Sequence, residues 1–337
     1  MGTQTKIEWA DSTWSPWRGC AKVSPGCANC YAEALAARNP GVLGGWGKGA
    51  PRVLAKNWDE PVGWNRKSTQ RFTEWSNRWD GTIRSMFKPQ SVPPSPARPR
   101  VFPSLCDWLD DEVPVEWLGR FLRLIHETQH LDWLLLTKRP ENWGKRLRAA
   151  HCATTGPVRI AIAEWLDCNP PVNVWLGVSV EDQKRAEERI PLLLETPARL
   201  RWLSVEPLLG EIGLRPKWLA DECNACGRPM PRNIEGCWNP HTGDDDCDGS
   251  RTVLRKVDWV VVGGESGPKA RECHADWIRS LVRQCQSAEV PVFVKQVGSR
   301  PIDRSVRAAE WGVVKDPKGG DPNEWPMDLC VRQFPER

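Results

Sequence analysis

The sequence predicts an α/β protein built on a parallel sheet, in the form of a partial or complete (β/α) barrel. Short, continuous apolar runs carry this prediction, together with the helix-like stretches that separate them. Such runs are typical of strands buried on both faces, as in parallel sheets. They occur at 100–104, 131–137, 173–179, 200–205, 257–262 and 290–295, and a further strand is expected at 12–18.

Apolar residues at helical spacing predict helices between these strands. The expected helices span 32–38, 115–130, 181–194 and 276–288. Parallel strands joined in this way need right-handed crossover connections. Six or seven strand–helix units favour a barrel, although the sequence alone separates a barrel poorly from an open, doubly wound sheet.

We expect one domain over residues 1–337 with two insertions. Residues 40–100 are basic and rich in Gly, Pro and Trp, and end in a proline-rich loop. Residues 221–256 contain four cysteines among Gly, Pro, Asn and Asp, and are too polar to form an apolar core.

The composition is that of an ordinary globular protein. The 47 Lys and Arg against 43 Asp and Glu give a net charge of +4, which excludes a histone-like polycation. No apolar run of about 18 residues or secretion signal is evident, so we expect a soluble, cytoplasmic protein without a membrane partner. The 21 tryptophans are first a sign of side-chain packing in the core, and only second a sign of ligand binding.

Charged residues follow the expected strands. Glu181, Glu206 and Glu265 each come at or just after a strand end, as do Lys138 and Lys295. The carboxyl ends of parallel strands meet at one edge of the sheet, where catalytic residues lie, so we expect a polar pocket there. For Glu181 alone, charging the first turn of a helix is an equally good interpretation.

Cys20, Cys27 and Cys30 are spaced C-x6-C-x2-C around a Pro-Gly turn. In a chain of 13 cysteines without a secretion signal, this spacing favours metal ligation over disulfides. Three thiolates can hold three irons of a [4Fe–4S] cluster and leave the fourth iron open. The alternative is a zinc site completed by a distant fourth ligand.

These residues and their surroundings resemble the phage-associated three-Cys-motif family, a radical-SAM-like family of unassigned function. The resemblance covers most of the chain outside 40–100 and 221–256. The matching motifs are TKIEW at 5–9, TWSP at 13–16, CYAE at 30–33, LTKRP at 136–140, GVSVE at 177–181, SVEPLL at 204–209, GGESG at 263–267 and FVKQVG at 293–298.

The resemblance implies a radical-SAM-type barrel that holds a [4Fe–4S] cluster and S-adenosyl-L-methionine. An electron donor would supply the electron that cleaves the sulfonium to a 5′-deoxyadenosyl radical, in order to modify or repair a substrate. Nucleic acid or a nucleotide is a candidate substrate. The cofactor would carry the chemistry, and the barrel would position it and exclude water.

The resemblance also implies cofactor-binding residues. Ser179 and Glu181 would contact the ribose hydroxyls, Glu206 and Glu265 would accept from the methionine amino group or the substrate, and Gly263 and Gly264 would allow close backbone approach. The catalytic residue stays open, with Lys138, Glu206 and Lys295 as candidates. The chain departs from the commonest radical-SAM pattern, because the first cysteine gap is six residues rather than three and the Gly-Gly-Glu motif comes later.

A second group of cysteines lies in the insertion at 221–256. C-x2-C followed by two further cysteines is typical of a structural zinc site, and a second iron–sulfur cluster is the alternative. The expected ligands are Cys223, Cys226, Cys237 and Cys247.

The insertion at 40–100 interleaves basic and aromatic residues, a combination that suits nucleic acid. The candidate contacts are Arg66, Lys67, Arg71, Arg78, Trp75 and Trp79. The alternative is an amphipathic helix over 68–79 with a solvated basic face. The two functions in competition are therefore a radical-SAM-like iron–sulfur enzyme and a non-catalytic, zinc-stabilised protein that binds nucleic acid or another partner.

Overall fold

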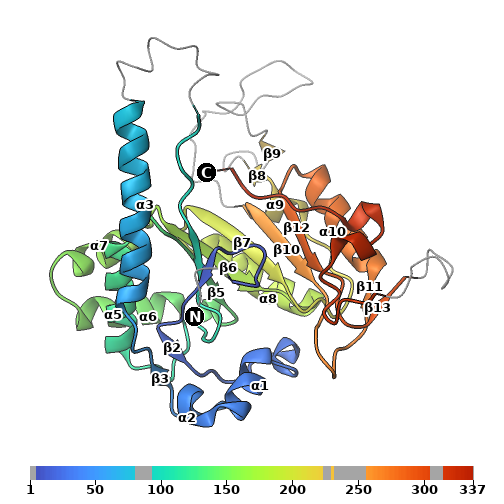
Figure 1. The fold of residues 1–337 in the computed structure, drawn as a ribbon, viewed down its shortest axis with the longest axis horizontal. Helices are drawn as coiled ribbons and strands as arrows, with labels where there is room; N and C mark the ends of the chain where they lie inside the picture. The colour runs from blue at the N-terminus through green and yellow to red at the C-terminus, as the bar shows by residue number, and fades with distance from the viewer. Residues whose placement is uncertain (1–4, 80–92, 223–228, 231–255, 304–313, 337) are drawn as a thin grey trace. The chain divides into compact units, whose positions relative to one another are not determined.

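The computed structural model describes residues 5–79, 93–222, 229–230, 256–303 and 314–336 (Figure 1). The chain divides into two compact units. Unit 1 comprises residues 1–21, 32–135 and 142–175, and unit 2 comprises residues 22–31, 136–141 and 176–337. Strands β5 (Asp132–Thr137) and β6 (Val174–Ser179) each belong partly to both units.

Seven strands form one sheet in the order β1-β4-β5-β6-β7-β10-β12. Besides β5 and β6, they are β1 (Ser12–Thr13), β4 (Arg100–Phe102), β7 (Leu200–Val205), β10 (Trp259–Gly263) and β12 (Val292–Gln296). Within unit 1, β4 runs parallel to β1 and β5; within unit 2, β10 runs parallel to β7 and β12. The sheet follows the order of the chain without the reversal of a doubly wound sheet, which agrees with a partial barrel. The predicted α/β class with a parallel sheet is confirmed.

The six apolar runs all form strands of this sheet, as predicted. Every residue of β6, β7 and β10 is buried, which explains why these strands are mostly apolar instead of alternating; the polar exceptions are Ser179, Arg201 and Ser204. The strand expected over 12–18 is confirmed only in its first two residues, Ser12–Thr13. Pro16 lacks an N–H and interrupts it, so that β1 joins the sheet whereas β2 (Trp17–Arg18) pairs antiparallel with β3 (Val53–Leu54).

Unit 1 packs around aromatic residues. The indoles of Trp14 and Trp17 are fully buried and contact Phe121 on α5 (Val115–Glu127), whose ring lies edge-on to Trp133 of β5. These tryptophans therefore pack, as their abundance indicated. The other helices that start in this unit or run into it are α1 (Tyr31–Arg38), α2 (Pro40–Leu43), α3 (Asp59–Arg78), α6 (Trp143–Ala153) and α7 (Pro157–Leu166).

Unit 2 places helices and short strands between the C-terminal strands of the sheet. Trp202 of β7 packs over Gly177 of β6, where an added Cβ would lie 2.4 Å from the indole ring. The helices are α8 (Gln183–Glu195), α9 (Pro216–Leu219) and α10 (Ala275–Ser287), and the short strands are β8 (Asp221–Glu222), β9 (Pro229–Met230), β11 (Cys273–His274) and β13 (Pro301–Ile302). The predicted helices over 32–38, 115–130, 181–194 and 276–288 are confirmed as α1, α5, α8 and α10.

In the described ranges, we find no helix with the length and apolar character that a bilayer crossing requires.

Candidate functional site

The segment 22–31, here called the thiol loop, belongs to unit 2 and contains Cys27 and Cys30. Ser24 precedes a short 3-10 helix, Pro25–Cys27, that forms the centre of the loop. Both thiols are partly exposed, so they are accessible as ligands. Donors of the loop form hydrogen bonds to two carboxylates, Glu181 and Glu265, that follow β6 and β10.

Glu181 fixes the first half of the thiol loop. Its side chain is fully buried, and its Oε1 accepts a hydrogen bond from the Gly26 N–H (3.3 Å) and one from the Ser24 hydroxyl. The other oxygen, Oε2, accepts from Arg189 on α8 at 2.8 Å, and the same Arg189 nitrogen donates to the Ser179 carbonyl. A buried carboxylate thus joins the thiol loop to the end of β6.

Glu265 fixes the second half of the loop. Its Oε2 accepts from the Asn29 amide at 3.0 Å, and both of its oxygens accept from the Arg271 guanidinium. Arg271 in turn donates to the Pro25 carbonyl at 3.0 Å, which closes the connection. Burial alone raises the pKa of Glu265, but the hydrogen bonds from Arg271 and Asn29 outweigh burial and bring the pKa below its usual value.

The lowered pKa of Glu265 predicts a pH-dependent stability. Its contribution is fully present above the usual carboxyl pKa of 4.5 and is lost as the pH falls through the lower, folded-state value. Glu265→Gln should therefore melt below the wild type at neutral pH, with the gap closing below about pH 4. Glu272→Gln is the control, because Glu272 is an exposed partner of Arg300. A gap for Glu265→Gln that does not change with pH would contradict the assignment.

A third carboxylate at this edge binds a lysine instead of the thiol loop. Glu206, just after β7, accepts a hydrogen bond from Lys295 of β12 at 2.7 Å, and both side chains are partly exposed. Lys138, just after β5, donates to the Ser179 hydroxyl at 3.0 Å. The structure therefore brings Lys295 to Glu206 and Lys138 to Ser179, and the catalytic role of these residues stays a prediction.

The two glycines of the Gly-Gly-Glu motif are required by packing inside unit 2. A Cβ on Gly264 would lie 2.3 Å from the Val297 carbonyl oxygen, and one on Gly263 would lie 2.8 Å from Oε1 of Glu206. Side chains would collide at both positions, so the pair has a structural reason that does not involve a ligand. Close approach of a cofactor to Gly263 and Gly264 stays a prediction, as do cofactor contacts for Ser179, Glu181 and Glu265.

Cys20 lies in unit 1, where the preceding Gly19 forms a parallel bridge with Cys106. Burial raises the pKa of Cys106 well above its usual value, and the charges of Asp107 and Cys20 add to this. Cys106 is therefore expected to stay a neutral thiol. Among the residues that the structure describes, no three Cys, His, Asp or Glu side chains are grouped so as to hold a metal ion. The thiol set Cys20, Cys27 and Cys30 stays a prediction, and Cys223, Cys226, Cys237 and Cys247 lie outside the described residues.

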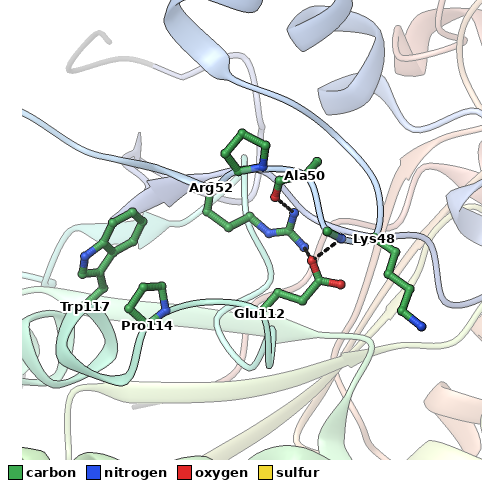
Figure 2. A pocket seen from close by; sticks show the side chains of 8 residues that line it. Lys48, Ala50, Arg52, Glu112, Pro114 and Trp117 are labelled. Carbon is green, nitrogen blue, oxygen red and sulfur yellow. Dashed lines mark hydrogen bonds and ion pairs between the residues drawn. The ribbon is translucent and has the colours of Figure 1, made fainter.

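A cavity of about 510 Å³ lies in unit 1 and is lined by residues 48–52, Glu112, Pro114 and Trp117 (Figure 2). Arg52 is one of the lining residues and donates to Asp110 (2.8 Å), Glu112 (3.0 Å) and two backbone carbonyls. Glu112 also accepts from the Gly49 N–H at 2.7 Å. Arg52 and Glu112 thus satisfy each other, and Lys48 is the remaining charged residue of the lining. The thiol-loop edge brings together more charged and polar side chains and is the better candidate site.

Sequence reasoning missed the residues that hold the thiol loop. It identified Glu181 and Glu265 but not Ser24, Asn29, Arg189 or Arg271. Arg189 lies on α8, eight residues after Glu181, and an arginine at that separation is only a weak sequence signal of an ion pair. Arg271, six residues after Glu265, and the polar residues inside the cysteine spacing could have been weighed as partners of the two carboxylates.

The fold and this edge define an α/β protein with a parallel sheet and a charged site at the carboxyl ends of its strands. The family comparison is more specific: a family model described as "Protein of unknown function (DUF5131)" matches residues 4–318, so the chain belongs to that family. Neither the curated proteins nor the solved structures contain a match to the chain.

Proposed function

We propose that this protein is a radical-SAM-like iron–sulfur enzyme that reductively cleaves S-adenosyl-L-methionine to modify or repair a substrate. The observation that carries the proposal is the attachment of the thiol loop to two carboxylates, Glu181 and Glu265, that follow strands of a parallel sheet. Cofactors and substrates of α/β proteins bind at this end of the strands. A loop that presents thiols there is suited to hold a cofactor against a substrate.

The residues of the loop fit an iron–sulfur cluster in their chemistry. Cys27 and Cys30 are partly exposed thiols, and Cys20 would be the third ligand; when bound, the cluster would supply one electron at a time. Arg271 donates to the Pro25 carbonyl while both oxygens of Glu265 accept from its guanidinium, so it orients the loop without adding a net charge. The two carboxylates then act as positioning residues that keep the loop in place.

The remaining charged pair is available for substrate or cofactor. Glu206 and Lys295 are bonded to each other and neither binds the thiol loop, and both remain partly exposed. On this proposal, Glu206 accepts hydrogen bonds from an amino group and Lys295 holds or moves a proton at its Nζ. The same proposal includes two memberships: that the protein is of the radical-SAM type, and that it belongs to the phage-associated family that its motifs resemble.

Metal analysis of anaerobically purified protein tests the proposal directly. The wild type should be brown, with about four irons per chain, and the Cys20→Ser, Cys27→Ser, Cys30→Ser variant should lose both colour and iron. The matched control replaces three exposed cysteines, Cys152, Cys168 and Cys330, and should keep its iron. With reductant and S-adenosyl-L-methionine, the wild type should form 5′-deoxyadenosine.

The alternative is a zinc-stabilised binding protein without catalytic activity. It predicts colourless protein with zinc that the triple cysteine variant loses, and no 5′-deoxyadenosine. That result would overturn the proposal. Iron without 5′-deoxyadenosine, even with DNA or RNA added, would keep the cluster and reject the radical reaction.

A further inference from the structure

Helix α3 changes character along its length. Its first half buries Pro61, Trp64 and Ser68, at the spacing of one helix face. The same stripe continues as Phe72 and Trp75, and then as Trp79 just beyond the helix, but these rings are exposed or half-buried. Figure 1 shows the C-terminal half of α3 extending past helices α5, α6 and α7 of the same unit. The apolar stripe therefore runs beyond the core that its first half joins.

Positive charge surrounds this stripe. Arg66, Lys67, Arg71 and Arg78 are exposed, against one exposed carboxylate, Glu74, in the same stretch. Glu74 accepts a hydrogen bond from Gln70 at 2.8 Å. In the described part of the chain, none of the four cations forms an ion pair. The helix expected over 68–79 is confirmed as the end of α3, which closes at Arg78. Exposed cations are required both by a solvated basic face and by a nucleic-acid contact, so the aromatic rings decide between the two interpretations.

The aromatic rings are held in place instead of hanging free. Phe72 packs against Trp75 (centroids 6.0 Å apart) and against His130 (5.4 Å). The Trp75 indole donates to the Pro93 carbonyl at 3.1 Å, and the Arg78 guanidinium lies 5.8 Å from the centre of the Trp79 ring. Rings fixed in this way lose little conformational freedom when another flat group stacks on them.

We infer that the C-terminal half of α3 is a binding surface for single-stranded nucleic acid. The four cations, opposed by a single carboxylate, can neutralise the phosphates of a polyanion. The aromatic rings, already held in place and flanked by arginines, can stack on unpaired bases. A second copy of the chain is a poorer occupant, because two such helices would oppose positive charge to positive charge. An acidic protein would satisfy the charges but would leave the aromatic rings unused. This surface goes beyond the proposed function and needs no metal.

Fluorescence anisotropy with a labelled 20-nucleotide single strand tests the inference. The logarithm of the binding constant should fall with the logarithm of salt concentration with a slope of about −3 for four cations, and each cation removed should reduce that slope by about 0.7. Lys67→Gln, Arg71→Gln, Arg78→Gln should therefore abolish most of the salt-dependent binding. Phe72→Ala should weaken binding about 5- to 150-fold while changing the slope little.

The matched control removes three exposed cations from α6 and α7, as Lys145→Gln, Arg148→Gln, Arg159→Gln, and should leave binding intact. Equal losses in both triple variants, or no binding by the wild type, would overturn the inference. So would equal affinity for duplex DNA with no effect of Phe72→Ala, or a dimer that the α3 substitutions dissociate. The Cys20→Ser, Cys27→Ser, Cys30→Ser variant should still bind the single strand. A failure of the nucleic-acid inference can therefore be distinguished from a failure of the iron–sulfur proposal.

Discussion

Arg189→Met is expected to lower the free energy of unfolding by about 3–5 kcal/mol, because it leaves the buried Glu181 carboxylate without its cation. Glu181 is fully buried, and Arg189 contacts it at 2.8 Å with a side chain that is itself 7% exposed. Ser24 and Gly26 still donate hydrogen bonds to Glu181, but both donors are neutral and do not replace the lost cation. Chemical denaturation of the wild type and the variant measures the difference.

Two further variants make this prediction specific. Glu181→Gln combined with Arg189→Met removes both charges and should recover most of the lost stability, since no buried ion then lacks a partner. Lys184→Met, on the same helix, removes an exposed cation 3.9 Å from Glu188 and should cost less than about 1 kcal/mol. If Arg189→Met behaved like Lys184→Met, the Glu181 carboxylate would not depend on Arg189.

The strands were predictable because burial on both faces leaves a direct mark on the sequence. In β6 and β10 nearly all positions are apolar, and the Gly177 position is explained once Trp202 is seen to pack over it. The start of the sheet was harder, because β1 is two residues long and a short strand has no period to detect. Helices α6 and α7 were not predicted, because no strand lies between them in the chain to mark where one helix ends and the next begins. Both helices contact α5, and they contact each other.

The part of the site that could be predicted is the part that follows from the order of strands along the chain. Glu181, Glu206 and Glu265 follow strands, so sheet topology alone brings them to one edge. Their partners depend on contacts between distant parts of the chain, such as Asn29 with Glu265 across 236 residues. Several of these contacts use backbone groups, for example the Gly26 N–H and the Pro25 carbonyl, and a backbone group has no residue signature.

On the proposal that the thiol loop holds an iron–sulfur cluster, Gly26→Ala is expected to weaken metal binding about 10- to 100-fold, as substitutions next to metal ligands do. A Cβ at position 26 would lie 2.9 Å from Oε1 of Glu181 and 3.0 Å from its Cδ. The carboxylate cannot retreat, because Arg189 holds its other oxygen. The loop must therefore move away from Glu181 and take Cys27 with it, although every thiol and every charge remains. Iron per chain after anaerobic reconstitution, titrated against a competing chelator, measures the effect.

Gly210→Ala is the matched control, since a Cβ at position 210 meets no atom within 4 Å, and it should bind iron like the wild type. Gly26→Ala should lose no more than about 1–3 kcal/mol of stability, the usual cost of one added methyl group in a packed site. Weaker iron binding in a variant that still folds would show that the position of the loop, in addition to its thiols, determines metal affinity. Undiminished iron binding in Gly26→Ala would mean that Glu181 does not position the ligands, and the role proposed for the two carboxylates would be wrong.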